Sequence, residues 1–257
     1  MDINLNSDLG ESYGAWRMGD DRALLSVVGS ANVACGFHAG DPLVMADTVR
    51  RAAESGVSLG AHPSFPDLQG FGRRAMQVSP AELAAMVTYQ VGALMGIAQS
   101  QGQRVTHVKP HGAMNNMACE DAAMAATIAA AVKALDAQLI LLAPALSELA
   151  RAGRAAGLRV ADEVFADRAY TEQGTLVPRS QPGAVLHDST DCLAHVLRMM
   201  ERGGIVTVGG QLLPCSFHSI CVHGDSAHAV TTAAAVRDGL RAAGHRLRTL
   251  PELFSPG

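Results

Sequence analysis

Residues able to do chemistry recur in seven short clusters along this 257-residue chain, and nearly every cluster follows a brief apolar run. A stretch with the apolar spacing of a helix comes after almost every one. Short apolar runs that alternate with helical stretches are typical of repeated strand–helix units around a parallel sheet. Because the carboxyl ends of parallel strands lie on one face, the pattern predicts an active site assembled from strand ends.

The segment HVKPH places His107, Lys109 and His111 at alternate positions. On a strand such side chains point to the same face, and Pro110 argues against a helix. The only other lysine, Lys133, falls on a helix where solvation explains it. Lys109 and His111 are therefore interpreted as catalytic residues. The alternative for Lys109 is a purely structural role in a salt bridge.

Two carboxylates, Asp8 and Glu11, flank Leu9 and Gly10 at the end of the first expected strand. Placed in one small volume, they can separate their pKa values and serve as acid and base. Capping of the following turn is the alternative for both.

Two histidines occupy equivalent places after later strands. His38 lies in a glycine-flanked loop, and His62 precedes Pro63. A lone histidine is usually a core residue, but two at equivalent strand ends favour a site. Asp41, which follows His38 and precedes Pro42, is better explained as a helix N-cap.

Further along, charged pairs favour binding of an anionic substrate or phosphate. Arg73 and Arg74 carry guanidinium groups that suit planar oxyanions, although one of them can simply be solvated. Asp167 and Arg168 follow another strand and can pair with each other. These four are binding candidates.

His223 and Asp225 complete the ring of candidates after the last expected strand. Both are binding candidates as well. Asp225 has an alternative role as a cap for the helix that follows Ser226.

A metal site is the competing interpretation, with Asp8, His38 and His62 as its ligands. Against it, the chain contains no HExxH motif, and Lys109 would place an ammonium close to a dication. The sequence therefore predicts no tightly bound metal.

The elements that must position these clusters are seven strands and seven helices. The expected strands cover residues 3–8, 31–35, 58–61, 105–108, 139–142, 159–164 and 219–222, and the expected helices cover 21–28, 42–55, 80–101, 120–135, 146–156, 188–201 and 228–243. Residues 171–186 are irregular and lid-like, and 203–217 look like an extra extended piece. A single (β/α) barrel over residues 1–257 is expected, with an open doubly wound sheet as the alternative.

Composition and motif content exclude several classes of protein. A formal charge of −4 provides no basic surface for nucleic acid or anionic membrane. The start lacks a targeting pattern and no apolar stretch approaches the length of a membrane span, so a cytoplasmic protein is expected. Five scattered cysteines without a CxxC pair argue against disulfides and a structural zinc site. A phosphate loop of the form GxxxxGK[ST] is absent, and no GxGxxG motif occurs at the first expected strand–helix turn.

Six blocks in order, NSDLGESYG, NVACGFHAGDP, GAHPSFPDLQGFGRR, HVKPHGAMNN, EVFADRAYTEQGTLVPRS and CVHGD, resemble the successive motifs of the LamB/YcsF family. The resemblance implies a distorted seven-stranded (β/α) barrel, TIM-like, of the glycoside hydrolase/deacetylase type. It also implies the activity of the family's bacterial members, the A subunit of ATP-dependent 5-oxoprolinase. That enzyme opens the lactam of 5-oxoproline to L-glutamate with ATP, and works with subunits B and C.

On this hypothesis Lys109, Arg168 and Arg73 or Arg74 hold oxyanions. Asp8 or Glu11 activates water, with His38, His62 and His111 as proton carriers or orienting groups. ATP, with Mg as its counter-ion, binds either this chain or its partners; the sequence does not choose. Two rival classes stay open: a metal-dependent amidase or deacetylase that works without ATP, and a non-enzymatic carbohydrate- or lactam-binding protein.

Overall fold

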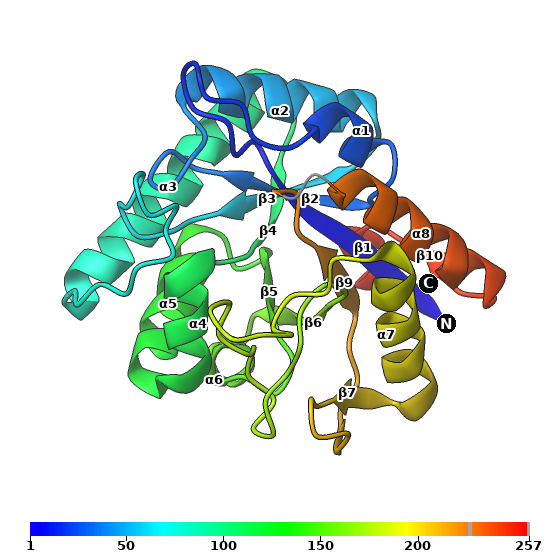
Figure 1. Cartoon of the computed structure of the whole chain (residues 1–257). Helices are drawn as coiled ribbons and strands as arrows, with labels where there is room; N and C mark the ends of the chain where they lie inside the picture. The colour runs from blue at the N-terminus through cyan, green and yellow to red at the C-terminus, as the bar shows by residue number, and fades with distance from the viewer. Residues whose placement is uncertain (226–227, 256–257) are drawn as a thin grey trace.

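Seven parallel strands close into a barrel in the computed structural model, which describes residues 1–225 and 228–255 (Figure 1). The first strand, β1, pairs with β2 on one side and with β9 on the other, and this second pairing closes the sheet. The closed barrel confirms the expected fold class, and the open doubly wound sheet is excluded. The barrel strands are β1 (Asp2–Leu9), β2 (Ser30–Ala34), β3 (Ser58–His62), β4 (Val105–Val108), β5 (Ile140–Pro144), β6 (Arg159–Phe165) and β9 (Ser219–Val222).

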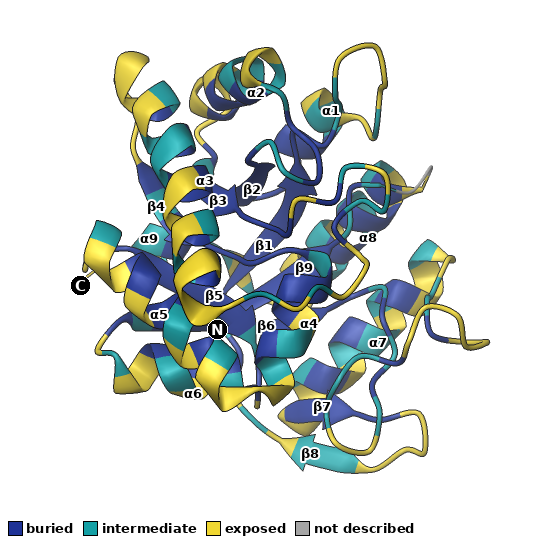
Figure 2. Ribbon diagram, turned by 90° about the vertical axis from the view of Figure 1, so that its left-hand side faces the viewer, coloured by how far each residue is buried: buried dark blue, intermediate teal, exposed yellow. Residues whose placement is uncertain are grey.

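Helices surround the barrel, with buried faces toward the strands and exposed faces outward (Figure 2). This placement buries the apolar stripe of each helix against the outer face of the sheet. The surrounding helices are α1 (Asp21–Leu25), α2 (Pro42–Glu54), α3 (Pro80–Ser100), α4 (Gly112–Glu120), α5 (Ala122–Leu135), α6 (Glu148–Ala155), α7 (Ser189–Arg202) and α8 (Ala229–Ala242).

Helix starts follow the capping residues in the sequence. The Asp41 side chain accepts hydrogen bonds from the backbone N–H groups of Leu43 and Val44, which confirms its role as the N-cap of α2. Ser79 and Glu82 form the expected capping box at the start of α3. Each cap sets where the chain leaves a loop above the strands and enters a helix.

One helix of the structure was not expected, and the helix that follows it begins later than expected. The segment expected as 120–135 begins only at Ala122, because Asp121 caps α5 and ends α4. The shorter helix α4 was missed, although Met114 and Ala118 bury one of its faces at helical spacing. The first helix also ends at Leu25, earlier than residue 28.

The chain between α7 and β9 forms an antiparallel hairpin of β7 (Gly204–Val206) and β8 (Leu212–Pro214). This confirms the extra extended piece expected there. Two C-terminal elements were not expected: β10 (Arg246–Leu247), which pairs with the start of β1, and α9 (Leu250–Leu253). Both are too short to produce a periodic signal.

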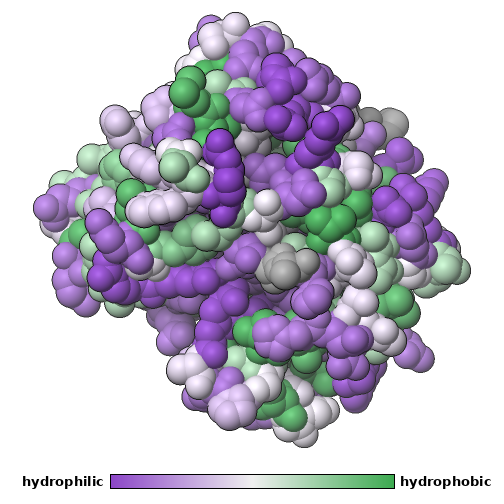
Figure 3. Space-filling view, turned by 45° about the horizontal axis from the view of Figure 1, so that its top comes forward, coloured by the Kyte–Doolittle hydropathy of each residue, from purple (hydrophilic) through white to green (hydrophobic). Residues whose placement is uncertain are grey.

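The expectation that no apolar stretch approaches the length of a membrane span needs one correction. By length and mean hydropathy alone, the outer helix α3 could cross a membrane. In the structure it packs against α5 and buries Leu83, Val87 and Leu94 along one side. It is therefore a covering helix of the barrel. On the face shown in Figure 3, hydrophobic residues form small patches separated by hydrophilic ones.

The interior of the barrel is unusually polar. Along β1, the buried residues Asn4, Asn6 and Asp8 lie at alternate positions and form side-chain hydrogen bonds with other strands. Gly60 on β3 makes room for the ring of His107, because a Cβ at that position would lie 2.1 Å from its Nε2 atom. The polar interior continues up to the carboxyl ends of the strands.

Candidate active site

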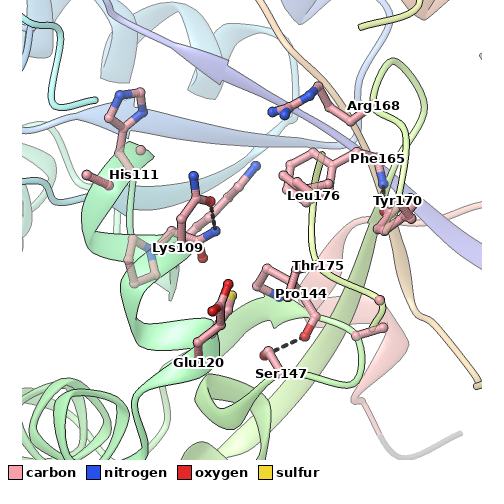
Figure 4. Close-up of a pocket in the computed structure, with 18 of the residues that line it drawn as sticks. Lys109, His111, Glu120, Pro144, Ser147, Phe165, Arg168, Tyr170, Thr175 and Leu176 are labelled. Atoms are coloured by element: carbon pink, nitrogen blue, oxygen red, sulfur yellow. Dashed lines mark hydrogen bonds between the residues drawn. The ribbon is translucent and has the colours of Figure 1, made fainter. Parts of the chain in front are cut away.

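A cavity of about 750 Å³ lies at the carboxyl ends of the barrel strands, covered in part by the irregular segment 171–186. Figure 4 shows Lys109 and His111 on one side of this cavity, with Phe165 and Arg168 across from them. The location agrees with strand ends as the place of chemistry. The sequence-predicted residues that line the cavity are Asp8, His62, Arg73, Lys109, His111, Arg168 and His223.

Lys109 forms the centre of a buried charge cluster just beyond β4. Its Nζ atom lies 3.0 Å from Asp8 Oδ1 and 3.2 Å from Glu163 Oε1. The same atom lies 3.1 Å from Cys221 Sγ and 5.2 Å from the centre of the Phe165 ring. One ammonium thus compensates two buried carboxylates, as a buried charge requires.

The pKa values in this cluster follow from that arrangement. Burial opposes ionisation of Asp8, but its interactions with His62 and then Lys109 hold its pKa well below the usual range. Burial also opposes the charge on Lys109, yet the carboxylate of Asp8 and then Cys221 and Glu163 raise its pKa well above the usual range. Burial raises the pKa of Glu163. Asp8 is therefore a carboxylate that faces the cavity with a permanent cation behind it.

A second buried cluster consists of Glu11, His38, His62 and His111, all 6% exposed or less. His38 Nε2 lies 3.3 Å from Glu11 Oε1, and His111 Nδ1 lies 3.7 Å from the same oxygen. His111 Nδ1 and His62 Nε2 are 3.0 Å apart. The rings of His38 and His111 stack with centres 3.8 Å apart. We call these four residues the histidine cluster.

Asp8 joins the two clusters. Its Oδ2 atom lies 3.4 Å from His62 Nε2, whereas its Oδ1 atom contacts Lys109. In the histidine cluster, burial and then the charge of Asp8 raise the pKa of Glu11 well above its usual range. Burial, followed by neighbouring imidazoles, holds the pKa values of His38 and His111 well below theirs.

His107, predicted to point with Lys109 and His111, lies in the barrel beneath them. Its Nε2 atom is 3.0 Å from Asn32 Oδ1, and Thr106 Oγ1 lies 2.9 Å from its Nδ1 atom. Burial, together with the charge of Lys109, lowers its pKa to about 3. His107 is therefore a neutral interior residue.

The arginine candidates separate into different places. Arg73 lines the cavity and forms an ion pair of 2.5 Å with Asp225. Arg74 is a correction: its side chain is largely exposed, pairs with Asp67 and does not line the cavity. Arg168 lines the cavity, but its guanidinium donates hydrogen bonds to the carbonyls of the covering segment.

Asp167 pairs with His223 at 2.9 Å, so its expected pairing with Arg168 is wrong. Burial opposes ionisation of Asp167, but His223 lowers its pKa below the ordinary value. The alternative role of Asp225, capping near Ser226, concerns residues outside the described part of the chain. Asp225 itself contacts Arg73.

Sequence reasoning missed four residues of the site. Asn6 and Asn32 hydrogen-bond to each other and to Glu163 and Asp8 respectively, and Glu163 contacts Lys109. All three are polar residues at inward positions of apolar strands, a signal that period-two counting can find. Arg179 lines the cavity from the covering segment, and nothing in its local sequence distinguishes it.

Together these groups provide a carboxylate that faces a cavity, a cation beside it, imidazoles next to it and arginines along the cavity wall. Such a set can bind an anionic small molecule and activate water at a carbonyl carbon.

Comparisons with known proteins agree over nearly the whole chain. Residues 3–255 match the model of the LamB/YcsF family. The chain is 62% identical to the A subunit of 5-oxoprolinase from Azoarcus sp. (strain BH72), covering 98% of this chain and 99% of that protein. It is 54% identical to the protein of the same name from Gluconobacter oxydans (strain 621H), covering 96% and 98%.

Among solved structures, a lactam utilization protein from Thermus thermophilus superposes with a TM-score of 0.91 at 44% identity, covering 97% of this chain and 100% of that one. The catalytic domain of a peptidoglycan N-acetylglucosamine deacetylase from Eubacterium rectale ATCC 33656 superposes with a TM-score of 0.52 at 12% identity, covering 97% and 88%. The second likeness concerns the fold alone.

Proposed function

Because the chain belongs to the LamB/YcsF family, we propose that it is the A subunit of a 5-oxoprolinase, a hydrolase of a cyclic amide. The reaction opens the lactam of 5-oxoproline to L-glutamate and is coupled to hydrolysis of ATP to ADP and phosphate. The observation that carries this proposal is Asp8 at the cavity wall, held between Lys109 and His62.

Lactam opening needs help because an amide carbonyl is a poor electrophile. Transfer of a phosphoryl group from ATP to the lactam oxygen makes the lactam carbonyl carbon more electrophilic, so that water can attack it. Breaking the ring C–N bond then leaves an acyl phosphate, which a second water hydrolyses. The site must therefore bind oxyanions and position a base for water.

The cavity supplies both requirements. Asp8 faces it and acts as the base, whereas Glu11 lies behind the histidines, so geometry favours Asp8 among the two carboxylates. His62 and His111 line the cavity next to Asp8, and His62 orients the Asp8 carboxylate from 3.4 Å. Lys109 keeps Asp8 ionised in its buried setting.

Arginines on the cavity wall provide sites for oxyanions. Arg73, Arg168 and Arg179 all line the cavity. Burial and then the charge of Arg179 lower the pKa of Arg168 to about 10, and burial and then the charge of Arg73 lower the pKa of Arg179. This concentration of positive charge suits the carboxylate of 5-oxoproline and a transferred phosphoryl group. His223 and its partner Asp167 adjoin the same wall.

ATP enters this proposal as co-substrate, with Mg as its counter-ion, and the assembly includes subunits B and C in the cytoplasm. The relatives carry the name of one lettered component of 5-oxoprolinase, which supports a multi-subunit enzyme. The chain holds no phosphate loop, so ATP binds either an unfamiliar pocket of this chain or the partner subunits.

The test is glutamate release from 5-oxoproline by the purified chain, with and without ATP and with and without subunits B and C. We expect glutamate and ADP in equal amounts, only with ATP and the complete assembly. An Asp8→Asn variant assembled in the same way should lose activity by about 100-fold or more. The Lys133→Gln variant on the exposed side of α5 serves as the matched control and should retain activity.

Glutamate formed by the chain alone without ATP would replace this proposal with an ATP-independent amidase. If the complete, folded assembly forms no glutamate, the proposal that 5-oxoproline is its substrate is wrong.

A further inference from the structure

The histidine cluster brings four potential ligand atoms into one small volume. These atoms are Glu11 Oε1, His38 Nε2, His62 Nε2 and His111 Nδ1, and all lie within 4.8 Å of one another. They come from the loop after β1, the loop after β2, the end of β3 and the start of α4. Four sequence-distant segments therefore converge on one point.

The spacing of these atoms matches a four-coordinate metal ion. Nitrogen and carboxylate ligands bind Zn²⁺ at about 2.0–2.2 Å, which puts tetrahedral ligands about 3.3–3.6 Å apart. Three separations in the cluster are 3.0, 3.3 and 3.7 Å. The other three pairs of these atoms lie within 4.8 Å of one another, so a bound ion would draw some of them closer together.

The hydrogen bonds on the outer side of the cluster provide an independent argument. His62 Nδ1 lies 2.6 Å from the carbonyl oxygen of Lys109, and His111 Nε2 lies 2.8 Å from that of Phe71. A carbonyl oxygen only accepts, so both outer nitrogens carry protons. In neutral rings, the inner nitrogens then present lone pairs to each other across 3.0 Å. Two facing lone pairs repel unless a positive species lies between them.

We propose that Glu11, His38, His62 and His111 bind one divalent transition-metal cation. Backbone carbonyls that hold the outer nitrogens of ligating histidines are typical of metal sites, because they set the tautomer and orient the ring. His38 is oriented differently, by stacking on His111. Imidazole and carboxylate ligands suit Zn²⁺ and its neighbours.

Lys109, which argued against a metal at the sequence level, does not oppose this site. Its ammonium points to Asp8 Oδ1, Glu163 and Cys221, whereas His62 contacts the other carboxylate oxygen of Asp8. The Asp8 carboxylate thus lies between the ammonium and the histidine cluster and reduces the repulsion. The ligands also differ from the set expected from sequence, since Glu11 and His111 replace Asp8.

A cation in the cluster would adjoin the cavity, because His62 and His111 belong to both. It would link the segments at the carboxyl ends of β1, β2, β3 and β4 beneath the proposed substrate. The inference concerns this chain alone and does not depend on the 5-oxoprolinase proposal.

The test uses the full chain purified without a histidine tag and stripped of metal with a chelator. Zn²⁺ is titrated against a competing chromophoric chelator, and Co²⁺ is added in parallel as a spectroscopic probe. We expect one tight Zn²⁺ per chain and intense visible Co²⁺ bands, which report four-coordinate geometry. Zinc-edge anomalous diffraction should place a peak among the four ligand atoms.

Two near-isosteric variants, Glu11→Gln and His38→Gln, should bind Zn²⁺ at least about 100-fold more weakly. The matched control is His218→Gln, which removes a partly exposed histidine next to Asp162 and should bind as the wild type does. A cooperative melting transition of each metal-free variant shows that it is folded. Zn²⁺ should raise the melting temperature of the wild type and of the control, but not that of the two cluster variants.

A metal-free wild-type chain that takes up no Zn²⁺ or Co²⁺ would overturn the proposal without reference to any variant. So would an anomalous peak elsewhere, or cluster variants that bind as tightly as the control. In those cases a shared proton would occupy the space between His62 and His111. Glutamate formation by the assembly tests the proposed function separately.

Discussion

At the scale of single residues, Lys109 determines the electrostatics of the barrel mouth. It is almost completely buried and contacts both Asp8 and Glu163. Removal of one partner from a buried ion pair is costly, because the remaining charge has lost its solvent and its counter-ion. The stability of the barrel mouth therefore depends on this ammonium, as does the proposed role of Asp8 as the base.

Replacement of Lys109 by Met should lower the free energy of unfolding by about 3–5 kcal/mol. Adding Glu163→Gln to the same chain should recover part of this loss, since only one carboxylate is then left unpaired. Urea unfolding of the single and double variants measures the effect. Lys133→Met, the exposed lysine control, should change stability by about 0.5 kcal/mol or less. Equal stability of the Lys109 and Lys133 variants would contradict the prediction.

Asp167 predicts a dependence of stability on pH. Because His223 lowers its folded-state pKa below the unfolded value, ionised Asp167 stabilises the fold above the unfolded pKa. That contribution disappears as the pH falls through the folded pKa, from about pH 5 downward. The stability advantage of the wild type over Asp167→Asn should therefore shrink between pH 7 and pH 3 in urea unfolding. A difference that stays constant over this range would exclude the mechanism.

At the scale of elements, close approach between neighbouring strands limits which residues fit. Gly60 on β3 lies opposite His107 on β4 in the sheet register. A methyl group there would lie too close to a ring that has little space to move, since it is completely buried. Gly96, on the outer helix α3, has no such restriction.

Gly60→Ala should therefore destabilise the protein by about 1–3 kcal/mol. Gly96→Ala is the matched control, because Gly96 lies in α3 with nothing within 4 Å of its would-be Cβ. That control should stabilise by about 0.5–1 kcal/mol, since alanine is the better helix former. Thermal and urea unfolding report both changes, and destabilisation of similar size in both variants would show that the close contact is unimportant.

At the scale of the whole molecule, the two ends of the described chain meet. β10 pairs with the start of β1, and α9 places Leu250 against Ile140 and Leu142 inside the barrel. In Figure 1, β10 accordingly lies beside the N-terminal strand β1. We propose that residues 1–257 are one domain, because the closing pair of β1 and β9 spans most of the sequence.

Leu250→Ala should lower the free energy of unfolding by about 2–5 kcal/mol, because it leaves a cavity in the barrel floor. It should shift one cooperative transition, seen alike by calorimetry and far-ultraviolet circular dichroism. Leu43→Ala, at a leucine that is 83% exposed, should have little effect. Appearance of a second transition in the Leu250 variant would argue for separate folding units.

Most of the architecture follows from the sequence alone. Short apolar runs and amphipathic stretches are local signals, so the seven barrel strands and most covering helices could be predicted, as could the Asp41 cap and the Ser79 capping box. The same signals placed Asp8, Lys109 and the histidines at strand ends. The family resemblance added the fold class and the proposed activity, which periodicity does not encode.

Only the tertiary structure decided which side chains meet. Lys109 could have faced the histidines or the carboxylates, and barrel closure placed it beside Asp8 and Glu163. Arg74 and Arg73 are neighbours in sequence, yet only Arg73 lines the cavity. The physical reason is that contacts between strands depend on register and closure, which act over long sequence separations, whereas periodicity reports only the local face of each element.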